Sequence, residues 1–506
     1  MAMANDLLTP DDVFNRELLA NAHPPDWVNP KPHDVYNLVV LGAGTAGLVV
    51  AAGAAALGAR VALVEERLMG GDCLNFGCVP SKAVIRASRA AYALKEASEY
   101  GGRANGSNSF SFPCAMERMR RLRAEISAHD SVQRFTSLGA HVFLGAAVFT
   151  SHSTVDVDAI RLRFKKAVIA TGGRPDRPPI PGLAEAGFLT NETVFSLTEL
   201  PARLVVMGAG PIGCELAQAF QRLGSQVTII TRGARILPRE DPDVSALLAK
   251  RFEREGIRLV FEAKIPCVER RKGEKVVHIE HGAAREELSA TEILVSVGRV
   301  PNVEGLNLAA AGVEYDAKGV RVDDRLRTSN PNVYAAGDVC SPFKFTHAAE
   351  AMARIALQNA LFFGRRRASE LFIPWTTYTD PEVAHVGLTE QEAQRRAFKV
   401  EAFTLPLAEV DRATLDGETE GFARVHMDAK TRRILGATLV SRHAGESIGE
   451  LVLAMNQGLK LEALSGVIHP YPTQAEVIKR LGDASMKSRL KPWMRSVLEK
   501  YFAWRR

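Results

Sequence analysis

The sequence "YNLVVLGAGTAGLVVAAGAAALGARVALVEE", Tyr36–Glu66, decides the fold class. Its pattern is an apolar strand, a glycine-rich turn, a helix of small residues and a second strand that ends in an acid. Gly42, Gly44 and Gly47 have the GxGxxG spacing. This order predicts a βαβ unit whose turn binds the pyrophosphate of a dinucleotide at the helix N-terminus.

The same pattern recurs in "ARLVVMGAGPIGCELAQAFQRLGSQVTIITR", Ala202–Arg232, with Gly208, Gly210 and Gly213 as its glycines. One GxGxxG motif alone is weak evidence, but each copy lies between a predicted strand and a predicted helix. From about Phe372, strand-like stretches and then helical segments indicate a separate α+β domain. The sequence therefore predicts an α/β protein with two Rossmann-like dinucleotide-binding domains and a C-terminal α+β domain.

The residue that ends the second strand of each repeat indicates which dinucleotide binds there. In the first repeat it is Glu65, and a carboxylate there accepts hydrogen bonds from both hydroxyls of an unphosphorylated ribose, as in FAD or NAD. In the second repeat the matching residue is Thr231, followed by Arg232 and Arg235. Arginines suit a 2′-phosphate, so we expect NADPH rather than NADH at this site. The alternative is that Arg232 and Arg235 are solvated loop charges.

Length and charge narrow the class of protein. A chain of 506 residues is expected to form more than one domain, and 46% hydrophobic and 24% charged residues are ordinary for a globular protein. The net charge of +6 suits anionic small molecules and is not the dense basic surface of a nucleic-acid binder. We find no secretory signal and no run of about 18 apolar residues, so we expect a cytoplasmic protein.

The stretch "GGDCLNFGCVPSK", Gly70–Lys82, holds a close pair of cysteines, Cys73 and Cys78. Six cysteines in this length do not form a disulfide framework, and in a reducing compartment a close pair is more often catalytic than structural. The spacing excludes a thioredoxin-type CxxC motif. Together with two dinucleotide sites, the pair suggests electron flow from NADPH through a flavin to the two sulfurs. The alternative is a structural disulfide or a buried pair of thiols.

At this point the sequence resembles the class I pyridine nucleotide–disulfide oxidoreductases, the family of glutathione reductase, dihydrolipoyl dehydrogenase and mercuric reductase. "GGDCLNFGCVPSK" is similar to the family's active site, and the resemblance covers roughly residues 35–485. Four further stretches follow in the family's order: "ATGGRP" at Ala170–Pro175, "SVGRVPN" at Ser296–Asn302, "VYAAGDV" at Val333–Val339 and "YTDPEVAHVGLTE" at Tyr378–Glu390.

The resemblance implies a role for each matching residue. Cys78 would lie against the flavin, Cys73 would be the interchange thiol that meets the acceptor, and Lys82 would lie by the flavin and pair with Glu215. The implied FAD contacts are Gly42, Gly44, Gly47, Glu65, Gly71, Lys82, Thr171, Gly172 and Asp338. The implied NADPH contacts are Gly208, Gly210, Gly213, Thr231, Arg232, Arg235 and Gly298. The resemblance also implies a homodimer in which Tyr471 and Glu476 reach the other subunit's cysteines.

The chain departs from the thiol–disulfide members near its end. Those members carry His-x-His-Pro-Thr-x-x-Glu, whereas this chain has "HPYPTQAE", His469–Glu476. Tyr471 therefore stands where the family has its acid/base histidine, and His469 matches the first histidine. A phenol with an ordinary pKa near ~10 is a poor base, so disulfide turnover is disfavoured. One alternative is that Tyr471 only packs at the dimer interface, and another is that His469 acts as a displaced base. The resemblance also implies that Glu476 orients residue 471.

Tyrosine at this position resembles mercuric reductase, as does "EVDRATLDGETEGF" at Glu409–Phe422. We expect a reductase that uses FAD and NADPH, with no structural metal and with Cys73 and Cys78 as transient ligands of thiol-bound Hg(II). The chain shows no N-terminal CxxC metal-binding domain and no vicinal cysteines at its C-terminus. The alternatives are a dihydrolipoyl dehydrogenase or glutathione reductase-like disulfide reductase and, in another class, a flavin redox sensor or membrane-docked partner.

The expected domain order follows these motifs. The basic tail "KSRLKPWMRSVLEKYFAWRR", with Pro492 near a helix start, has apolar residues at helical spacing. We expect it to dock on the enzyme's own surface, and the alternative is an anionic membrane surface. The predicted segments are 1–34 extension, 35–180 FAD-binding domain (first part), 181–300 NAD(P)H-binding domain, 301–372 FAD-binding domain (second part), 373–486 dimerisation domain and 487–506 basic amphipathic tail.

Overall fold

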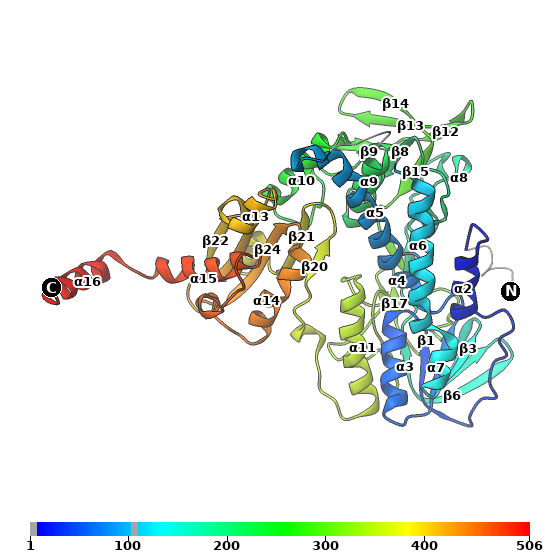
Figure 1. The fold of residues 1–506 in the computed structure, drawn as a ribbon. Helices are drawn as coiled ribbons and strands as arrows, with labels where there is room; N and C mark the ends of the chain where they lie inside the picture. Colours follow the sequence, from blue (N-terminus) through cyan, green and yellow to red (C-terminus); the bar gives the residue numbers. More distant parts are fainter. Residues whose placement is uncertain (1–7, 103–109) are drawn as a thin grey trace. The chain divides into compact units, whose positions relative to one another are not determined.

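The computed structural model describes residues 8–102 and 110–506, and Figure 1 shows its fold. Contacts divide the chain into two compact units. The first comprises the chain up to Ala234 together with Phe252–Leu371, and the second comprises Arg235–Arg251 and Phe372–Arg506. Each unit has a buried apolar core of its own.

The first βαβ unit forms over the residues that the sequence predicted. Strand β1 (Tyr36–Leu41) is followed by helix α3 (Thr45–Ala56) and strand β2 (Val61–Glu65). The two strands pair in parallel. Every residue of β1 except Asn37 is buried, because a parallel strand inside a sheet is covered on both faces.

This pair belongs to a seven-stranded sheet of order β3-β2-β1-β6-β5-β4, in which β19 also pairs with β6. Strands β1, β2, β3, β6 and β19 are parallel, and β4 and β5 form an antiparallel extension. The bounds are β3 Ala140–Leu144, β4 Ala147–Ser151, β5 Thr154–Val157, β6 Ile160–Ile169 and β19 Val333–Ala335. Parallel strands end at one edge of the sheet, so the segments after β1, β6 and β19 meet there.

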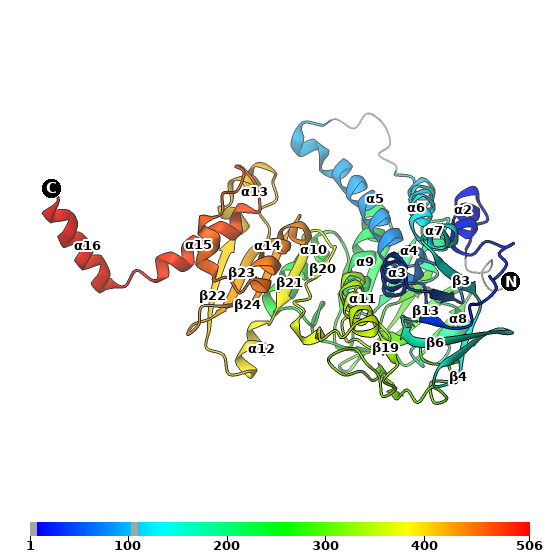
Figure 2. The ribbon, with the colours of Figure 1, turned by 90° about the horizontal axis from the view of Figure 1, so that it is seen from below.

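Two pairs of helices pack closely in this unit. Helix α3 lies side by side with α11 (Thr346–Leu361) in both views (Figures 1 and 2). Gly53 permits this approach, because a Cβ there would lie 2.5 Å from Leu357 Cδ2. Helix α5 (Cys78–Glu96) packs against α9 (Pro211–Leu223), which brings the start of the cysteine-bearing helix to the second nucleotide fold.

The second glycine-rich motif also lies in a βαβ unit. A four-stranded parallel sheet has the order β10-β9-β8-β15, and α9 connects β8 to β9. An antiparallel group of β11, β12, β13 and β14 follows in the chain. The bounds are β8 Arg203–Met207, β9 Gln226–Ile230, β10 Arg258–Val260, β11 Ala263–Lys264, β12 Val268–Arg271, β13 Glu274–His281, β14 Ala284–Ala290 and β15 Glu292–Val295.

The second unit is built on a five-stranded antiparallel sheet of order β20-β21-β24-β23-β22. Helices α14 (Ala444–Asn456) and α15 (Glu476–Ser488) supply apolar residues to its core. The strand bounds are β20 Trp375–Thr377, β21 Glu382–Gly387, β22 Val400–Pro406, β23 Phe422–Asp428 and β24 Ile434–Ser441. This domain and the two βαβ units confirm the predicted fold class.

The segment Arg235–Arg251 groups with this second unit, although the sequence placed it in the nucleotide domain. Trp375 Nε1 donates a hydrogen bond of 2.6 Å to Glu240, and Arg424 pairs with Asp241 at 3.5 Å. Such pairings join residues far apart in the sequence, so local patterns did not indicate them.

The two ends of the chain differ in how they pack. Helix α2 (Val13–Ala22), in the expected N-terminal extension, contributes Leu18 to the core of the first unit. Helix α16 (Pro492–Trp504) has no buried residue, so the expected docking on the enzyme's own surface is not found. Within residues 8–102 and 110–506, no helix is both long and apolar enough to cross a membrane.

Candidate active site

The cysteine pair lies on two consecutive helices. Cys73 is inside the short helix α4 (Gly71–Asn75), and Cys78 is the first residue of α5. Both are free thiols in the structure. Gly71 has a left-handed φ of +58°, and a Cβ there would lie only 2.6 Å from Gly44 Cα. The cysteine loop thus rests directly on the glycine-rich turn after β1.

A hydrogen bond between the two sulfurs changes their pKa values in opposite directions. The bond to Cys73, aided by the positive charge of Lys82, lowers the pKa of Cys78 to about 6, against the opposing effect of burial. The same bond and burial raise the pKa of Cys73 well above its ordinary value. Thr346 Oγ1 lies 3.4 Å from Cys78 Sγ and also favours its thiolate. At neutral pH the pair therefore holds one proton, on Cys73, and one negative charge, on Cys78.

Lys82 is held by an ion pair. Its Nζ donates to Glu215 Oε2 of α9 at 2.8 Å, and the Glu215 side chain is only 6% exposed. A carboxylate so deeply buried needs a partner charge, and a lysine so paired keeps one position. The packing of α5 on α9 therefore fixes a cation beside Cys78.

The first glycine-rich turn has the shape that a dinucleotide needs. A Cβ at Gly42 would lie 2.4 Å from the Ala170 carbonyl oxygen, and one at Gly47 would lie 1.8 Å from the Gly42 oxygen. At Gly44 the nearest atom would be Gly71 Cα at 3.7 Å. The outer glycines thus permit tight packing, whereas the middle one leaves its backbone open to a pyrophosphate, which fits FAD.

The second turn repeats this division of roles. Cβ atoms at Gly208 and Gly213 would lie 2.5 Å from the Ser296 oxygen and 2.2 Å from the Gly208 oxygen. At Gly210, among the residues that the structure describes and apart from its chain neighbours, no atom lies within 4 Å of the Cβ position. The open space at the start of α9 fits the phosphates of a second dinucleotide.

Glu65 and Asp338, the two acids expected at the FAD site, both contact other groups of the protein. Glu65 accepts hydrogen bonds from the backbone N–H groups of Ala43 at 2.6 Å and Arg67 at 2.8 Å, and burial raises its pKa. Burial also raises the pKa of Asp338, whose carboxylate lies 3.6 Å from Arg299 Nε. Both lie at the strand edge where the resemblance places FAD.

Arg299 is a site residue that the sequence reasoning did not single out. Its guanidinium donates to the Gly173 carbonyl at 2.7 Å and lies 3.2 Å from Asp72, the neighbour of Cys73. It thus links Asp338 to the cysteine loop. The sequence feature that could have identified Arg299 is its position within Ser296–Asn302, one of the stretches that resemble the family.

The other nucleotide-site residues lie on loops. Thr231 is half-buried and accepts from the Gly233 N–H at 3.1 Å, and Arg232 is exposed. Arg235 donates to the Pro238 carbonyl at 3.0 Å. Thr171 donates to the Asn302 carbonyl at 2.7 Å, and Gly172 and Gly298 have positive φ angles of +67° and +159°.

The C-terminal candidates all belong to the second unit. The Tyr471 hydroxyl donates to Asp411 at 2.9 Å, and Tyr471 is 71% exposed. This bond raises the pKa of Tyr471 further, and Glu476 acts on the phenol only through its charge. His469 Nε2 lies 3.0 Å from Glu450. Within one chain the hydrogen-bond partner of the phenol is Asp411, which helix α13 (Asp411–Leu415) brings there from a distant part of the sequence.

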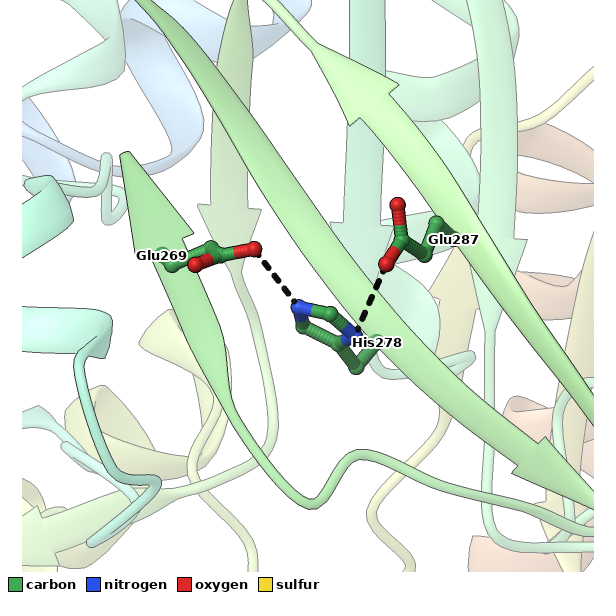
Figure 3. A group of neighbouring side chains, drawn as sticks. All are labelled: Glu269, His278 and Glu287. Carbon is green, nitrogen blue, oxygen red and sulfur yellow. Dashed lines mark hydrogen bonds and ion pairs between the residues drawn. The ribbon is translucent and has the colours of Figure 1, made fainter. Parts of the chain in front are cut away.

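A second group of potential metal ligands lies on the antiparallel strands β12, β13 and β14. Figure 3 shows His278 between Glu269 and Glu287, at 3.1 Å and 3.6 Å. Arg271 pairs with both carboxylates. Arg271 thus neutralises part of the charge of the two carboxylates, and the group forms an exposed network of ion pairs on the strands.

Comparisons with known proteins agree with this geometry. Residues 36–353 match the family described as pyridine nucleotide-disulphide oxidoreductase, and residues 373–481 match its dimerisation domain. A mercuric reductase of Bacillus cereus is 36% identical over 445 residues, which cover 88% of this chain and 70% of that protein. A dihydrolipoyl dehydrogenase of Thermus scotoductus is 34% identical over 471 residues, which cover 89% of this chain and 98% of that protein.

Solved structures give the same result. The Cu(II) complex of the HOCl-induced flavoprotein disulfide reductase RclA from Escherichia coli aligns with a TM-score of 0.80 at 27% identity, over 89% of this chain and 100% of that chain. The dimerisation-domain match indicates a homodimer. Because a family match covers more than half of its length, the chain belongs to the pyridine nucleotide-disulphide oxidoreductases, and it is an FAD-dependent enzyme.

Proposed function

We propose that this enzyme is an NADPH-dependent reductase of thiol-bound soft metal ions, with Hg(II) as the first acceptor to test. Cys73 and Cys78 would carry the electrons, and Cys73 would meet the acceptor first. The observation that carries the proposal is Tyr471, held by Asp411 at 2.9 Å, at the position where thiol–disulfide members have an acid/base histidine.

The chain's own residues would prepare the site. The open backbones of Gly44 and Gly210 would bind the two pyrophosphates, and Lys82, fixed by Glu215, would keep a positive charge beside Cys78. When bound, FAD supplies two-electron transfer between the nicotinamide and the disulfide. One NADPH and one proton would convert a mercury(II) dithiolate into elemental mercury, two thiols and NADP⁺, so atoms and electrons balance.

The protonation of Cys73 and Tyr471 favours a metal ion over a disulfide as the electron acceptor. Dithiol–disulfide exchange must take the proton from Cys73, whose pKa is raised, and the phenol of Tyr471 has a raised pKa as well. At neutral pH an even smaller fraction of Tyr471 than of free tyrosine is therefore phenolate, the form that could accept the proton. A soft cation needs no such base, because it displaces the thiol proton as it binds to sulfur.

Preference for NADPH is part of the proposal. Thr231 and Arg232 end the second repeat where an acid would repel a 2′-phosphate. Replacing both Arg232 and Arg235 by alanine should lower kcat/KM for NADPH by at least about tenfold, as expected for lost charge-assisted hydrogen bonds, and leave NADH use nearly unchanged. Arg239→Ala, a nearby exposed arginine, is the control. An unchanged NADPH-to-NADH ratio in the double variant would remove this part of the proposal.

The direct test is NADPH oxidation by the FAD-loaded protein with a panel of acceptors. The panel is Hg(II) with excess thiol, Cu(II) with excess thiol, glutathione disulfide, lipoamide and no acceptor; Cu(II) is included because RclA forms a Cu(II) complex. We expect turnover with a metal ion that is lost in Cys73→Ala. Turnover with a disulfide alone would move the enzyme to the disulfide reductases.

A disulfide reductase is the second candidate activity. It is favoured by the dihydrolipoyl dehydrogenase relative, 98% of whose length aligns, and by His469, whose Nε2 lies 3.0 Å from Glu450. A carboxylate at that distance would hold the imidazole in one orientation for proton transfer. Under this alternative, His469→Gln should abolish disulfide turnover and leave metal-ion turnover unchanged.

A second candidate role concerns helix α16. Its apolar side chains are exposed, and basic residues surround them, which fits the interface of an anionic lipid bilayer. The exposed apolar residues are Trp493, Val497, Leu498, Tyr501, Phe502 and Trp504. The basic residues of the tail are Lys487, Arg489, Lys491, Arg495, Lys500, Arg505 and Arg506.

Cosedimentation with vesicles tests this role. The full chain should bind phosphatidylserine-containing vesicles and not neutral ones, and deletion of residues 490–506 should abolish binding without loss of turnover. Salt near 1 M should release the protein, because exposed charges are then screened over about 3 Å. Equal binding by the shortened chain would eliminate the role, and a change of oligomeric state on deletion would assign the helix to a second copy instead.

A further inference from the structure

The helix that carries Cys73 is too short to be stable alone. Helix α4 has five residues, and an isolated helix of that length does not form in water. Its position must come from what packs around it. Leu68, Met69 and Leu74, on both sides of Cys73, belong to the same buried cluster as Leu18 of the N-terminal helix α2.

A buried arginine joins α2 to the end of this helix. Arg123, in α6 (Phe112–Ser127), is only 3% exposed. Its Nη1 donates to the Asn75 carbonyl at 2.8 Å, and its Nη2 donates to Asn15 Oδ1 at 2.7 Å. Asn75 is itself fully buried. A guanidinium holds two acceptors in a fixed geometry, so the position of Asn15 is passed to the last residue of α4.

The same N-terminal segment also holds the start of the loop. The Met69 N–H donates to the Ala22 carbonyl at 3.0 Å, and His23 hydrogen-bonds the Arg67 carbonyl. Asn75 closes the loop on itself, because its Nδ2 donates to the Met69 carbonyl at 3.1 Å and to the Gly71 carbonyl at 2.8 Å. Both ends of the loop before and after Cys73 are thus fixed to residues 15–23.

We propose that the N-terminal segment is a positioning element for the redox pair, with Asn15 and Arg123 as positioning residues that act through Asn75. The inference rests on the proposed redox role of Cys73 and Cys78 and gives the expected N-terminal extension a function. It makes the hydrogen bond between the two sulfurs depend on a helix that contacts neither of them.

The charges around the pair explain which property should change. Cys78 faces Lys82 from its own helix, Glu215 from α9 and the hydroxyl of Thr346 from α11, and none of these groups is on α4. Cys73 is the group that α4 supplies, and its hydrogen bond is the largest influence on Cys78. Loosening α4 should therefore weaken that bond and make Cys78 harder to deprotonate, while the other charges stay in place.

Site-resolved alkylation of the chemically reduced, FAD-loaded protein tests this. The rate of iodoacetamide reaction at Cys78, followed by mass spectrometry as pH is varied, reports its thiolate fraction. In Asn15→Ala and in Arg123→Lys the profile should move to higher pH, with at least about a threefold lower rate at pH 6, the size expected from one weakened hydrogen bond. Asn15→Asp keeps an oxygen acceptor for Arg123 but loses the 2.7 Å hydrogen bond from Asn15 Nδ2 to the Pro10 carbonyl, so it should move the profile back toward that of the wild type.

Arg16→Ala is the matched control, because Arg16 lies on the same helix but pairs with Asp11 at the surface. A merely structural role would lower Tm and leave the profile of the folded enzyme unchanged, and that result in both variants would overturn the proposal. If Asn15→Ala does not fold, Arg123→Lys decides alone. The assay uses neither NADPH nor an acceptor, so it is independent of whether the proposed metal-ion reduction is correct.

Discussion

The position of a single proton determines what each cysteine can do. The hydrogen bond between the two sulfurs lowers the pKa of Cys78 to about 6, which favours its thiolate at neutral pH, and raises the pKa of Cys73, which favours its protonated form. A thiolate is the form that exchanges electrons and attacks disulfides, and a protonated thiol is protected until an acceptor binds. The unequal pair therefore assigns different tasks to two chemically identical side chains.

Replacing Lys82 by methionine should change the pH dependence of turnover. In the wild type we expect turnover to fall as pH decreases through about 6, because the thiolate of Cys78 is then protonated. Without the lysine charge, the pKa of Cys78 rises and this acid limb moves to higher pH. Lys95→Met, an exposed lysine on the same helix, should leave the limb in place. Coincident pH–rate profiles for all three proteins would contradict the role given to Lys82.

Tyr471→His tests the proton argument directly. A histidine titrates near neutral pH and would supply the missing base, so turnover with glutathione disulfide or lipoamide should increase by about 10²-fold or more. Turnover with Hg(II) should change little. Steady-state rates with both kinds of acceptor measure this, and Tyr471→Phe is the control for loss of the hydroxyl. No gain in disulfide turnover would show that another group already moves the proton.

At the scale of elements, each glycine-rich turn combines two different demands. The outer glycines permit strand and helix to pack, and the middle glycine leaves space for a ligand. Packing and binding should therefore be separable by single substitutions within one turn.

Gly210→Ala and Gly213→Ala form such a pair. At Gly210 an added methyl meets no atom of the described residues within 4 Å, its chain neighbours aside, so Tm without NADPH should be unchanged while KM for NADPH increases by about tenfold or more. At Gly213 the methyl would lie 2.2 Å from the Gly208 oxygen. Such overpacking should lower the free energy of unfolding by about 1–3 kcal/mol, and Tm should fall accordingly. Thermal melts and NADPH titrations distinguish the two. A destabilised Gly210→Ala with normal KM would reverse the assignment.

At the scale of the whole molecule, the homodimer raises the question of where Tyr471 acts. The resemblance implies that it reaches the other subunit's cysteines. Tyr471 belongs to the second compact unit, and Cys73 and Cys78 belong to the first.

Mixing two variants tests a shared site, once Tyr471→Ala by itself is shown to lack turnover. Refolded or co-expressed mixtures of Cys73→Ala and Tyr471→Ala should recover about a quarter of wild-type turnover, because half of the dimers are hybrids and one of their two sites is intact. If each site uses residues of one chain only, no hybrid contains an intact site and no activity returns. The unmixed variants are the controls.

The sequence predicted the parts of this molecule that depend on neighbouring residues. Both βαβ units have local glycine spacing and local hydrophobic patterns, and they lie where these predicted. The bonds from Arg123 to Asn15 and from Tyr471 to Asp411 join distant parts of the chain, so no local pattern could indicate them. The unequal pKa values of the two cysteines also arise only after folding, because their main cause is the hydrogen bond that the fold creates between the two sulfurs.

The central claim is that Cys73 and Cys78 carry electrons that come from NADPH. Its most direct measurement is anaerobic titration of the oxidised, FAD-loaded protein with NADPH, followed by denaturation, alkylation and mass spectrometry of each cysteine. We predict that one NADPH per active site makes both Cys73 and Cys78 alkylatable and leaves the other four cysteines unchanged. Reduction of the flavin with no new label at either cysteine would contradict the account.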